Sequence, residues 1–105
     1  EHAIELFQNY LENYQDYKNF ADATYWLGRA YSANKSYLEA KNVFVRFQNE
    51  NPQHTKFANS MYDLANALIE LNELETAKNI LTLMLEKFPE HSLNIKTKQK
   101  LKELY

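Results

Sequence analysis

The three histidines are the side chains of this 105-residue chain best suited to binding a metal or moving protons: His2, His54 and His91. No two of them have the HxxxH spacing that places two imidazoles on one helix face, and no second set of ligands lies at metal-binding spacing. His54 and His91 each follow a proline by two residues, which indicates a repeated structural pattern. We therefore expect neither a metal nor a cofactor.

Other side chains that could take part in catalysis also lack the partner residues that catalysis requires. The chain has no cysteine, which removes thiol nucleophiles, thiolate metal sites and disulfides. A single glycine, Gly28, excludes glycine-rich phosphate loops and the nucleophile elbow of hydrolases. The carboxylates Glu70, Glu73 and Glu75 fall at a predicted helix end and turn, where solvation is the expected role. We expect no catalytic residue and no enzyme.

Charge and hydropathy exclude further partner classes. The net charge of −2 does not fit a nucleic-acid-binding protein. Basic residues gather at the C-terminal end, where a solvated surface is the simplest interpretation: Lys96, Lys98, Lys100 and Lys102. No apolar run approaches the roughly 18 residues of a membrane-spanning helix, so we expect no direct membrane insertion.

The elements that position these residues follow from an internal repeat. One glycine and two prolines leave little material for β-hairpin turns, while 45% hydrophobic residues suffice for a packed core. A shift of about 37 residues aligns the chain with itself. The matching positions are Leu27, Leu64 and Leu101; Ala3, Ala40 and Ala77; Phe7, Phe44 and Leu81; and Pro52 and Pro89.

Each repeat contains two apolar-periodic stretches at helical spacing, separated by a short turn and closed by a proline. The pattern predicts six helices, near residues 1–14, 19–33, 36–50, 55–71, 73–88 and 92–104. Thr55 and Ser92 stand at N-cap positions. Gly28 interrupts the second predicted helix at a cost of about 1 kcal/mol relative to alanine. We expect it to allow close approach of the next helix, opposite Ala40, as Ala65 does opposite Ala77.

These positions resemble the tetratricopeptide repeat, whose first helix carries W/L-G-Y and whose second carries A, F and P. The resemblance implies an all-α fold, a tetratricopeptide-repeat solenoid of about six antiparallel helices. It divides residues 1–105, as one domain, into the second helix of an incomplete repeat (1–18), two repeats (21–54 and 58–91) and a capping helix (92–105). The period of 37 exceeds the usual 34 because residues are added after each proline.

The segments "YWLG" (25–28) and "KFANSM" (56–61) resemble more narrowly the C-terminal domains of the Tol-Pal system periplasmic protein family YbgF (CpoB). This resemblance implies the periplasm of a Gram-negative bacterium, binding to TolA or a septal peptidoglycan synthase, and coordination of peptidoglycan synthesis with envelope constriction. The family trimerises through an N-terminal coiled coil that these residues do not include. The alternatives are a BamD-like structural component of outer-membrane protein assembly and a generic tetratricopeptide scaffold.

The family's geometry implies a partner-binding groove on the concave face formed by the first helices. The residues expected to line it are Asp22, Tyr25, Trp26, Arg29, Asn59, Tyr62 and Asn66. The corresponding positions of the last helix are Lys96, Gln99, Lys100 and Glu103. Exposed tyrosine, tryptophan and arginine are typical of interaction hot spots. Two structural interpretations stay open: Trp26 can pack on a neighbouring helix, and Tyr25 and Tyr62 can form a structural ladder.

The first predicted helix lacks the helix that precedes it in a complete repeat. Its apolar face, Ile4, Phe7 and Leu11, should therefore be partly exposed. We expect either a chain shortened within its first repeat or exchange of a helix between copies. The polar outer residues of the 36–50 helix favour an adaptor over a permanently buried subunit: Glu39, Lys41, Asn42, Arg46 and Gln48.

Overall fold

A computed structural model describes residues 2–13 and 17–105 of the chain, and this part forms six α-helices. They are α1 (His2–Asn13), α2 (Tyr17–Ala33), α3 (Tyr37–Glu50), α4 (Phe57–Glu70), α5 (Leu74–Lys87) and α6 (Asn94–Leu104). The predicted all-α class is confirmed. The predicted ends at residues 1 and 14 of the first helix lie outside the described residues.

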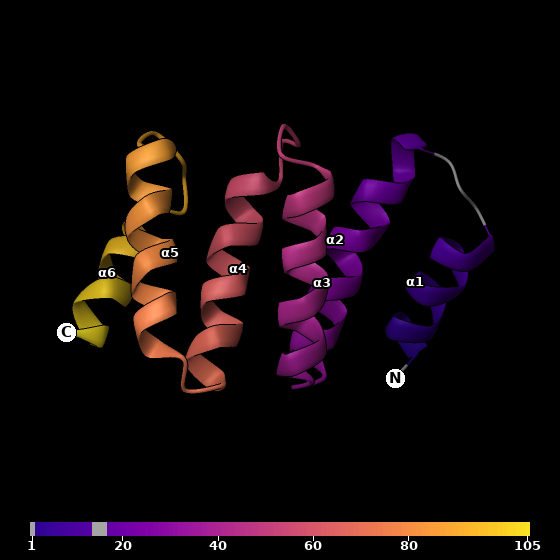
Figure 1. Ribbon diagram of the computed structural model, residues 1–105, viewed down its shortest axis with the longest axis horizontal. Helices are drawn as coiled ribbons and strands as arrows, with labels where there is room; N and C mark the ends of the chain where they lie inside the picture. The colour runs from indigo at the N-terminus through magenta and orange to yellow at the C-terminus, as the bar shows by residue number, and fades with distance from the viewer. Residues whose placement is uncertain (1, 14–16) are drawn as a thin grey trace.

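The helices follow one another along the longest axis, in a row from α1 at the N-terminus to α6 at the C-terminus, with α2 partly behind α3 and α6 partly behind α5 in this view (Figure 1). Each packs on its neighbours in the sequence, and α2 also contacts α4. The row measures 43 × 26 × 19 Å. An elongated stack of helix pairs in which neighbours supply the contacts is the architecture of a repeat solenoid.

The core repeats with the sequence. The second helix of each complete unit contributes one fully buried stripe, with exposures of 0%: Ala40, Phe44 and Phe47 in α3, and Ala77, Leu81 and Met84 in α5. The first helices cover these stripes with residues such as Tyr25, Leu64, Ala65 and Leu68. Because both faces of each pair are apolar at helical spacing, burial of these stripes holds the units together.

Gly28 lies against an aromatic ring. A Cβ atom at this position would be 2.6 Å from Cε1, 2.8 Å from Cδ1 and 2.9 Å from Cζ of Phe44. The expected close approach is therefore real, but its partner is Phe44 and the prediction of Ala40 was wrong. Ala40 lies one helical turn before Phe44 and is itself 0% exposed.

The turn inside each unit has the same unusual backbone. Lys35 and Asn72, 37 positions apart, are the non-glycine residues with positive φ among those described, at 62° and 63°. Ser36 N–H donates to Tyr31 O at 2.9 Å and Lys35 N–H to Ser32 O at 3.0 Å. This pair of hydrogen bonds is a Schellman motif, whose left-handed position normally holds glycine or asparagine.

Lys35→Gly should therefore stabilise the protein by about 0.5–1 kcal/mol. The left-handed conformation costs a residue with a Cβ atom roughly 1–2 kcal/mol, and glycine avoids this cost but loses more backbone entropy on folding, which offsets part of the gain. Thermal unfolding followed by circular dichroism checks this as a rise in Tm. Asn72→Gly is the matched control and should gain less, because asparagine tolerates this conformation. An unchanged or lower Tm for Lys35→Gly would contradict the strain argument.

Helix α1 packs on α2 more closely than its sequence position predicted. Ile4 is buried (8% exposed) in a cluster with Leu27 and Ala30, and Phe7 and Leu11 are half-buried beside them. The predicted partial exposure of this face is confirmed for Phe7 and Leu11 and wrong for Ile4, which α2 covers. The exposed apolar side chain of α1 is Leu6, at 56%. Exchange of a helix between copies stays a prediction.

Candidate protein-binding grooves

A polar hollow lies between the first helices of the two complete units, and we call it the α2/α4 groove. Its volume is about 450 Å³. Residues from α2, α4, the start of α3 and α6 line it: Arg29, Ser32, Ala33, Tyr37, Asp63, Asn66, Ala67, Ile69, Glu70 and Lys100. Cations, carboxylates and an amide thus face one cavity. Such a lining can bind both the backbone and the charged side chains of a peptide.

A hydrogen-bonded triad joins α2 to α4 beside this groove. The Tyr25 hydroxyl donates to Asp63 Oδ2 at 2.6 Å and accepts from Arg29 Nη1 at 3.3 Å. Arg29 Nε lies 3.9 Å from Asp63 Oδ2. The Arg29 side chain remains 51% exposed while that of Asp63 is 16% exposed. The triad therefore holds a guanidinium at the groove with part of its donor surface open to a ligand.

Burial and hydrogen bonding fix the protonation of this triad. Burial, reinforced by the hydrogen bond to Asp63, raises the pKa of Tyr25 to about 12. Burial also raises the pKa of Asp63 above its usual range, against the opposing effects of Tyr25, Arg29 and Lys56. The hydrogen bond to Tyr25 raises the pKa of Arg29. At neutral pH Tyr25 keeps its proton and Arg29 its charge.

A smaller hollow of about 220 Å³ continues from α4 to α6 and shares Lys100 with the α2/α4 groove. Its lining is Tyr62, Lys96, Gln99, Lys100 and Glu103. Within the part of the chain that the structure describes, neither lysine forms an ion pair. The two hollows therefore offer unpaired positive charge at the α6 end, which suits a carboxylate or an acidic side chain.

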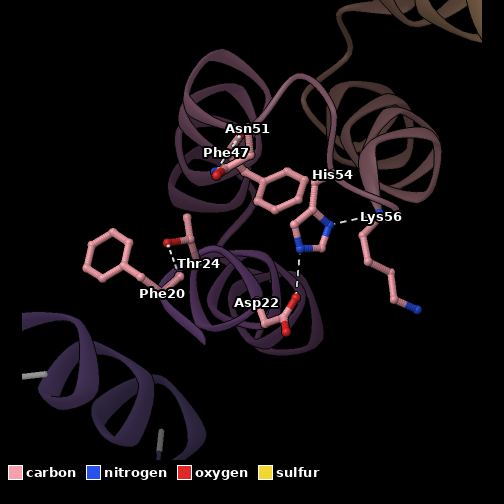
Figure 2. A network of polar contacts seen from close by, with 7 residues as sticks. All are labelled: Phe20, Asp22, Thr24, Phe47, Asn51, His54 and Lys56. Carbon is pink, nitrogen blue, oxygen red and sulfur yellow. Dashed lines mark hydrogen bonds and ion pairs between the residues drawn. The ribbon is translucent and has the colours of Figure 1, made fainter. Parts of the chain in front are cut away.

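The two histidines after the prolines hold the loops between units. His54 Nδ1 accepts from Lys56 N–H at 2.9 Å, and its Nε2 lies 2.8 Å from Asp22 Oδ1 (Figure 2). His91 repeats both contacts, accepting from Leu93 N–H at 3.0 Å and reaching Asn59 Oδ1 at 3.3 Å. Because Nδ1 accepts a backbone hydrogen bond, Nε2 carries the proton and donates. Each histidine thus joins a loop to the first helix of its own unit.

These contacts correct the predicted helix caps. The N-cap residues of α4 and α6 are Lys56 and Leu93, without side-chain cap hydrogen bonds, so the prediction of Thr55 and Ser92 was wrong. The histidine ring satisfies the N–H of the N-cap residue from two positions earlier. Among the described residues no group of three or more His, Asp or Glu could hold a metal ion.

The seven predicted groove residues occupy five different environments. Arg29 and Asn66 line the α2/α4 groove, and Tyr62 lines the hollow between α4 and α6. Asp22 and Asn59 bind the loop histidines. The remaining two, Tyr25 and Trp26, lie elsewhere.

Tyr25 and Trp26 are adjacent in sequence but point in different directions. Tyr25 is 1% exposed, with its ring among Phe44 and Phe47, so the expectation of an accessible Tyr25 ring was wrong. Trp26 is 41% exposed and lines a separate cavity between α1 and α2. Its ring lies edge-on to Tyr25 at 5.1 Å between centroids, with Arg29 and Lys56 within 6 Å of its face.

Sequence reasoning missed the contributions of Tyr37 and Glu70 to the α2/α4 groove. Glu70 ends α4 and Tyr37 begins α3, so neither belongs to the repeated face positions from which the groove was predicted. Glu73, which was expected to be solvated, has a side chain that is 41% exposed and also accepts two hydrogen bonds from Lys41 Nζ at 3.1 and 3.0 Å. That ion pair links α3 to the turn of the next unit.

The model of the tetratricopeptide repeat family matches the chain twice, at residues 22–54 and 59–91. No curated protein shows significant similarity to the chain. Among the residues that the structure describes, no helix combines the length and apolar character needed to cross a membrane.

Proposed function

Because the chain belongs to the tetratricopeptide repeat family, a family of protein-interaction modules, we propose that it is a non-enzymatic adaptor that binds a partner segment in the α2/α4 groove. The observation that carries this proposal is the triad of Tyr25, Asp63 and Arg29. It fixes an arginine at the wall of a hollow that also presents Asn66 and Lys100. A rigid, half-exposed arginine is a typical interaction hot spot.

The chemistry of the groove specifies an extended partner segment with at least one acidic group. Asn66 can pair with a peptide backbone through both its carbonyl and its amide. Arg29 and Lys100 can bind a carboxylate, whereas Asp63 and Glu70 disfavour a strongly acidic run. A segment of mixed charge fits best.

Within this class, the proposed partner is a segment of TolA or of a septal peptidoglycan synthase. The support is the likeness of residues 25–28 and 56–61 to the YbgF (CpoB) pattern. On this proposal the protein acts in the periplasm of a Gram-negative bacterium and coordinates peptidoglycan synthesis with envelope constriction. A coiled coil outside these residues would make the full protein a trimer.

Arg29→Ala should weaken binding of a soluble TolA fragment at least about tenfold, because a groove-centre arginine accounts for a large share of the affinity of such sites. Isothermal titration calorimetry with the wild type and the variant measures this. Tyr25→Ala is unsuitable, because loss of a buried ring would destabilise the fold.

Arg46→Ala is the matched control. The Arg46 side chain is 50% exposed on α3, pairs with Glu50 at 3.1 Å and lies 5.7 Å from the Phe20 ring. Arg29 has nearly the same exposure, one carboxylate partner and the same 5.7 Å distance to Trp26. Equal effects of the two substitutions would place the site outside the α2/α4 groove. Absence of binding by the wild type would remove TolA as the partner and leave the family-level adaptor.

A BamD-like structural subunit is the alternative, and exposed apolar side chains on the second helices favour it. Leu38 and Val45 of α3 are 55% and 39% exposed, and Leu83 of α5 is 40% exposed. Such a subunit would bury these side chains permanently against its assembly. Polar residues between them, such as Glu39, Asn42 and Arg46, are also exposed and support the adaptor.

A further inference from the structure

The hydrogen-bonded triad between α2 and α4 has a counterpart one unit later, in the hollow between α4 and α6, which we call the α4/α6 hollow. A shift of 37 residues places Tyr25 on Tyr62 and Asp63 on Lys100. Both Tyr62 and Lys100 line the hollow, whose volume is about 220 Å³. The chain thus repeats the tyrosine of the triad but puts an ammonium group where the triad has the carboxylate that binds it.

The surroundings of the two tyrosines correspond in other respects. The Tyr25 ring packs against two phenylalanines of α3, and its hydroxyl donates to a side chain of α4. Tyr62 packs against the buried clusters that contain the corresponding residues of α5, Leu81 and Met84. The helices around Tyr62 are therefore α4, α5 and α6, the counterparts of α2, α3 and α4. The structure describes all of them, so the comparison is between two complete environments.

The exchange of carboxylate for ammonium leaves hydrogen-bond donors without an acceptor. Among the described residues, the Tyr62 hydroxyl makes no hydrogen bond and Lys100 forms no ion pair. Lys96, one helical turn before Lys100, lines the same hollow and also forms no ion pair in this part of the chain. A carboxylate carries no donor and can accept several hydrogen bonds at once, so it is the complement of this set.

Glu103 limits the charge that the hollow can accept. It is exposed, lines the hollow and occupies the position that Arg29 and Asn66 have in the two complete units. Two lysines and one glutamate give the lining a single net positive charge. A single carboxylate balances this charge, whereas a doubly charged phosphate would leave an excess of negative charge.

We propose that the α4/α6 hollow binds the side-chain carboxylate of an aspartate or glutamate of the partner, which accepts from the Tyr62 hydroxyl and pairs with Lys100. The inference rests on the proposed function, because it assigns a second contact to the segment bound in the α2/α4 groove. Lys100 lines both hollows, so one segment can reach both. A carboxylate inside a segment that crosses both hollows belongs to a side chain and not to the chain terminus.

The probe is the peptide acetyl-Gly-Asp-Gly-amide, whose side-chain carboxylate is its only charge. At constant ionic strength it should cause saturable NMR shifts of the backbone amides around Tyr62 and Lys100, with the millimolar affinity expected of a single carboxylate. Acetyl-Gly-Asn-Gly-amide should cause none. Absence of saturable shifts with the aspartate peptide would overturn the proposal. Tighter binding of acetyl-Gly-Asn-Gly, which has only a terminal carboxylate, would also overturn it.

Substitutions in the protein separate a built site from general attraction between charges. Lys100→Gln should weaken binding of the aspartate peptide at least about fivefold. Lys98→Gln is the matched control, because it removes the same charge from an exposed residue of α6 outside the lining, and it should change the affinity less than about twofold. Tyr62→Phe keeps every charge and should weaken binding at least about threefold. Equal effects of the two lysine substitutions, or an unchanged affinity of Tyr62→Phe, would overturn the proposal.

Arg29→Ala should leave the binding of this short peptide unchanged, because Arg29 does not line the α4/α6 hollow. The test is therefore independent of TolA. Failure of the TolA fragment to bind would leave the carboxylate site standing, and failure of the aspartate peptide would leave the α2/α4 groove standing.

Lys100→Asp tests the geometry of the site without any ligand. This substitution restores the carboxylate of the triad, which should accept from the Tyr62 hydroxyl as Asp63 accepts from Tyr25. Tyr62→Phe should then lower the Tm in the Lys100→Asp background and leave the Tm of the wild type unchanged. The Lys100→Asp variant should also no longer bind the aspartate peptide. Equal changes of Tm in both backgrounds would overturn the proposal, because a carboxylate in the hollow would then not reach the hydroxyl.

Discussion

Replacing Gly28 by alanine should lower the free energy of unfolding by about 1–3 kcal/mol, although alanine is the better helix former by about 1 kcal/mol. The added Cβ would lie 2.6–2.9 Å from three atoms of the Phe44 ring. Phe44 is 0% exposed and its ring packs against that of Tyr25, so it has no free space into which to move. Urea unfolding followed by circular dichroism measures the loss.

The second unit supplies the rescue for this substitution. Its equivalent positions hold Ala65 and Leu81, both 0% exposed. The double variant Gly28→Ala/Phe44→Leu should therefore lose less unfolding free energy than the two single variants lose together. We expect a difference of about 1 kcal/mol or more in a double-mutant cycle. Additive effects would show that the ring does not determine the need for glycine. Ala65→Gly is the control, and it should destabilise because Leu81 leaves room for a methyl group.

Tyr25→Phe should destabilise the protein at neutral pH by about 1–3 kcal/mol, because Asp63 loses its 2.6 Å donor while its side chain is only 16% exposed. This cost should disappear at alkaline pH. The pKa of Tyr25 is about 12 in the folded protein against an ordinary value of 10, so between these values the folded state holds the proton more often than the unfolded state. The wild type therefore loses stability as the pH rises from about 10 to 12, by up to about 2–3 kcal/mol.

The phenylalanine variant lacks this proton and escapes that loss. The difference in unfolding free energy between wild type and variant should consequently shrink above pH 10 and reverse near pH 12. Urea unfolding of both proteins at pH 7, 10, 11 and 12 measures this difference. The effects of other ionisable groups, which the two proteins share, cancel in it. A pH-independent difference would show that Tyr25 ionises normally in the folded protein. Tyr62→Phe at pH 7 controls for the loss of a hydroxyl that makes no hydrogen bond among the described residues.

The helices and the packing stripes were predictable because they depend on local periodicity. Leu27, Leu64 and Leu101 mark the same position in three units, and the 37-residue shift fixes where each helix must lie. The left-handed turn residues Lys35 and Asn72 obey the same shift, yet lysine gives no signal for that conformation. Repetition therefore carries information that residue type alone lacks.

The groove was less predictable because neighbouring side chains on a helix point about 100° apart. The prediction that placed both Tyr25 and Trp26 in one groove overlooked this. The polar hydroxyl of Tyr25 also suggested a surface residue, although its ring belongs to the core. Its burial depends on Asp63, 38 positions later, which no local pattern connects to it. The prediction of the helix caps was wrong for a similar reason. The rings of His54 and His91 accept the backbone hydrogen bonds at the starts of α4 and α6, a role that was expected of the hydroxyls of Thr55 and Ser92.

The sequential packing of the helices also bears on how fast the chain can fold. Each helix finds its main contacts on the next one along the chain, and the connection inside each unit spans only a few residues, such as 34–36. Closing such short loops costs little chain entropy before contacts form, so the barrier to folding is low and structure can start in either unit and spread. The direct α2–α4 contact, with the Tyr25–Asp63 hydrogen bond, couples the two starting points into one cooperative transition.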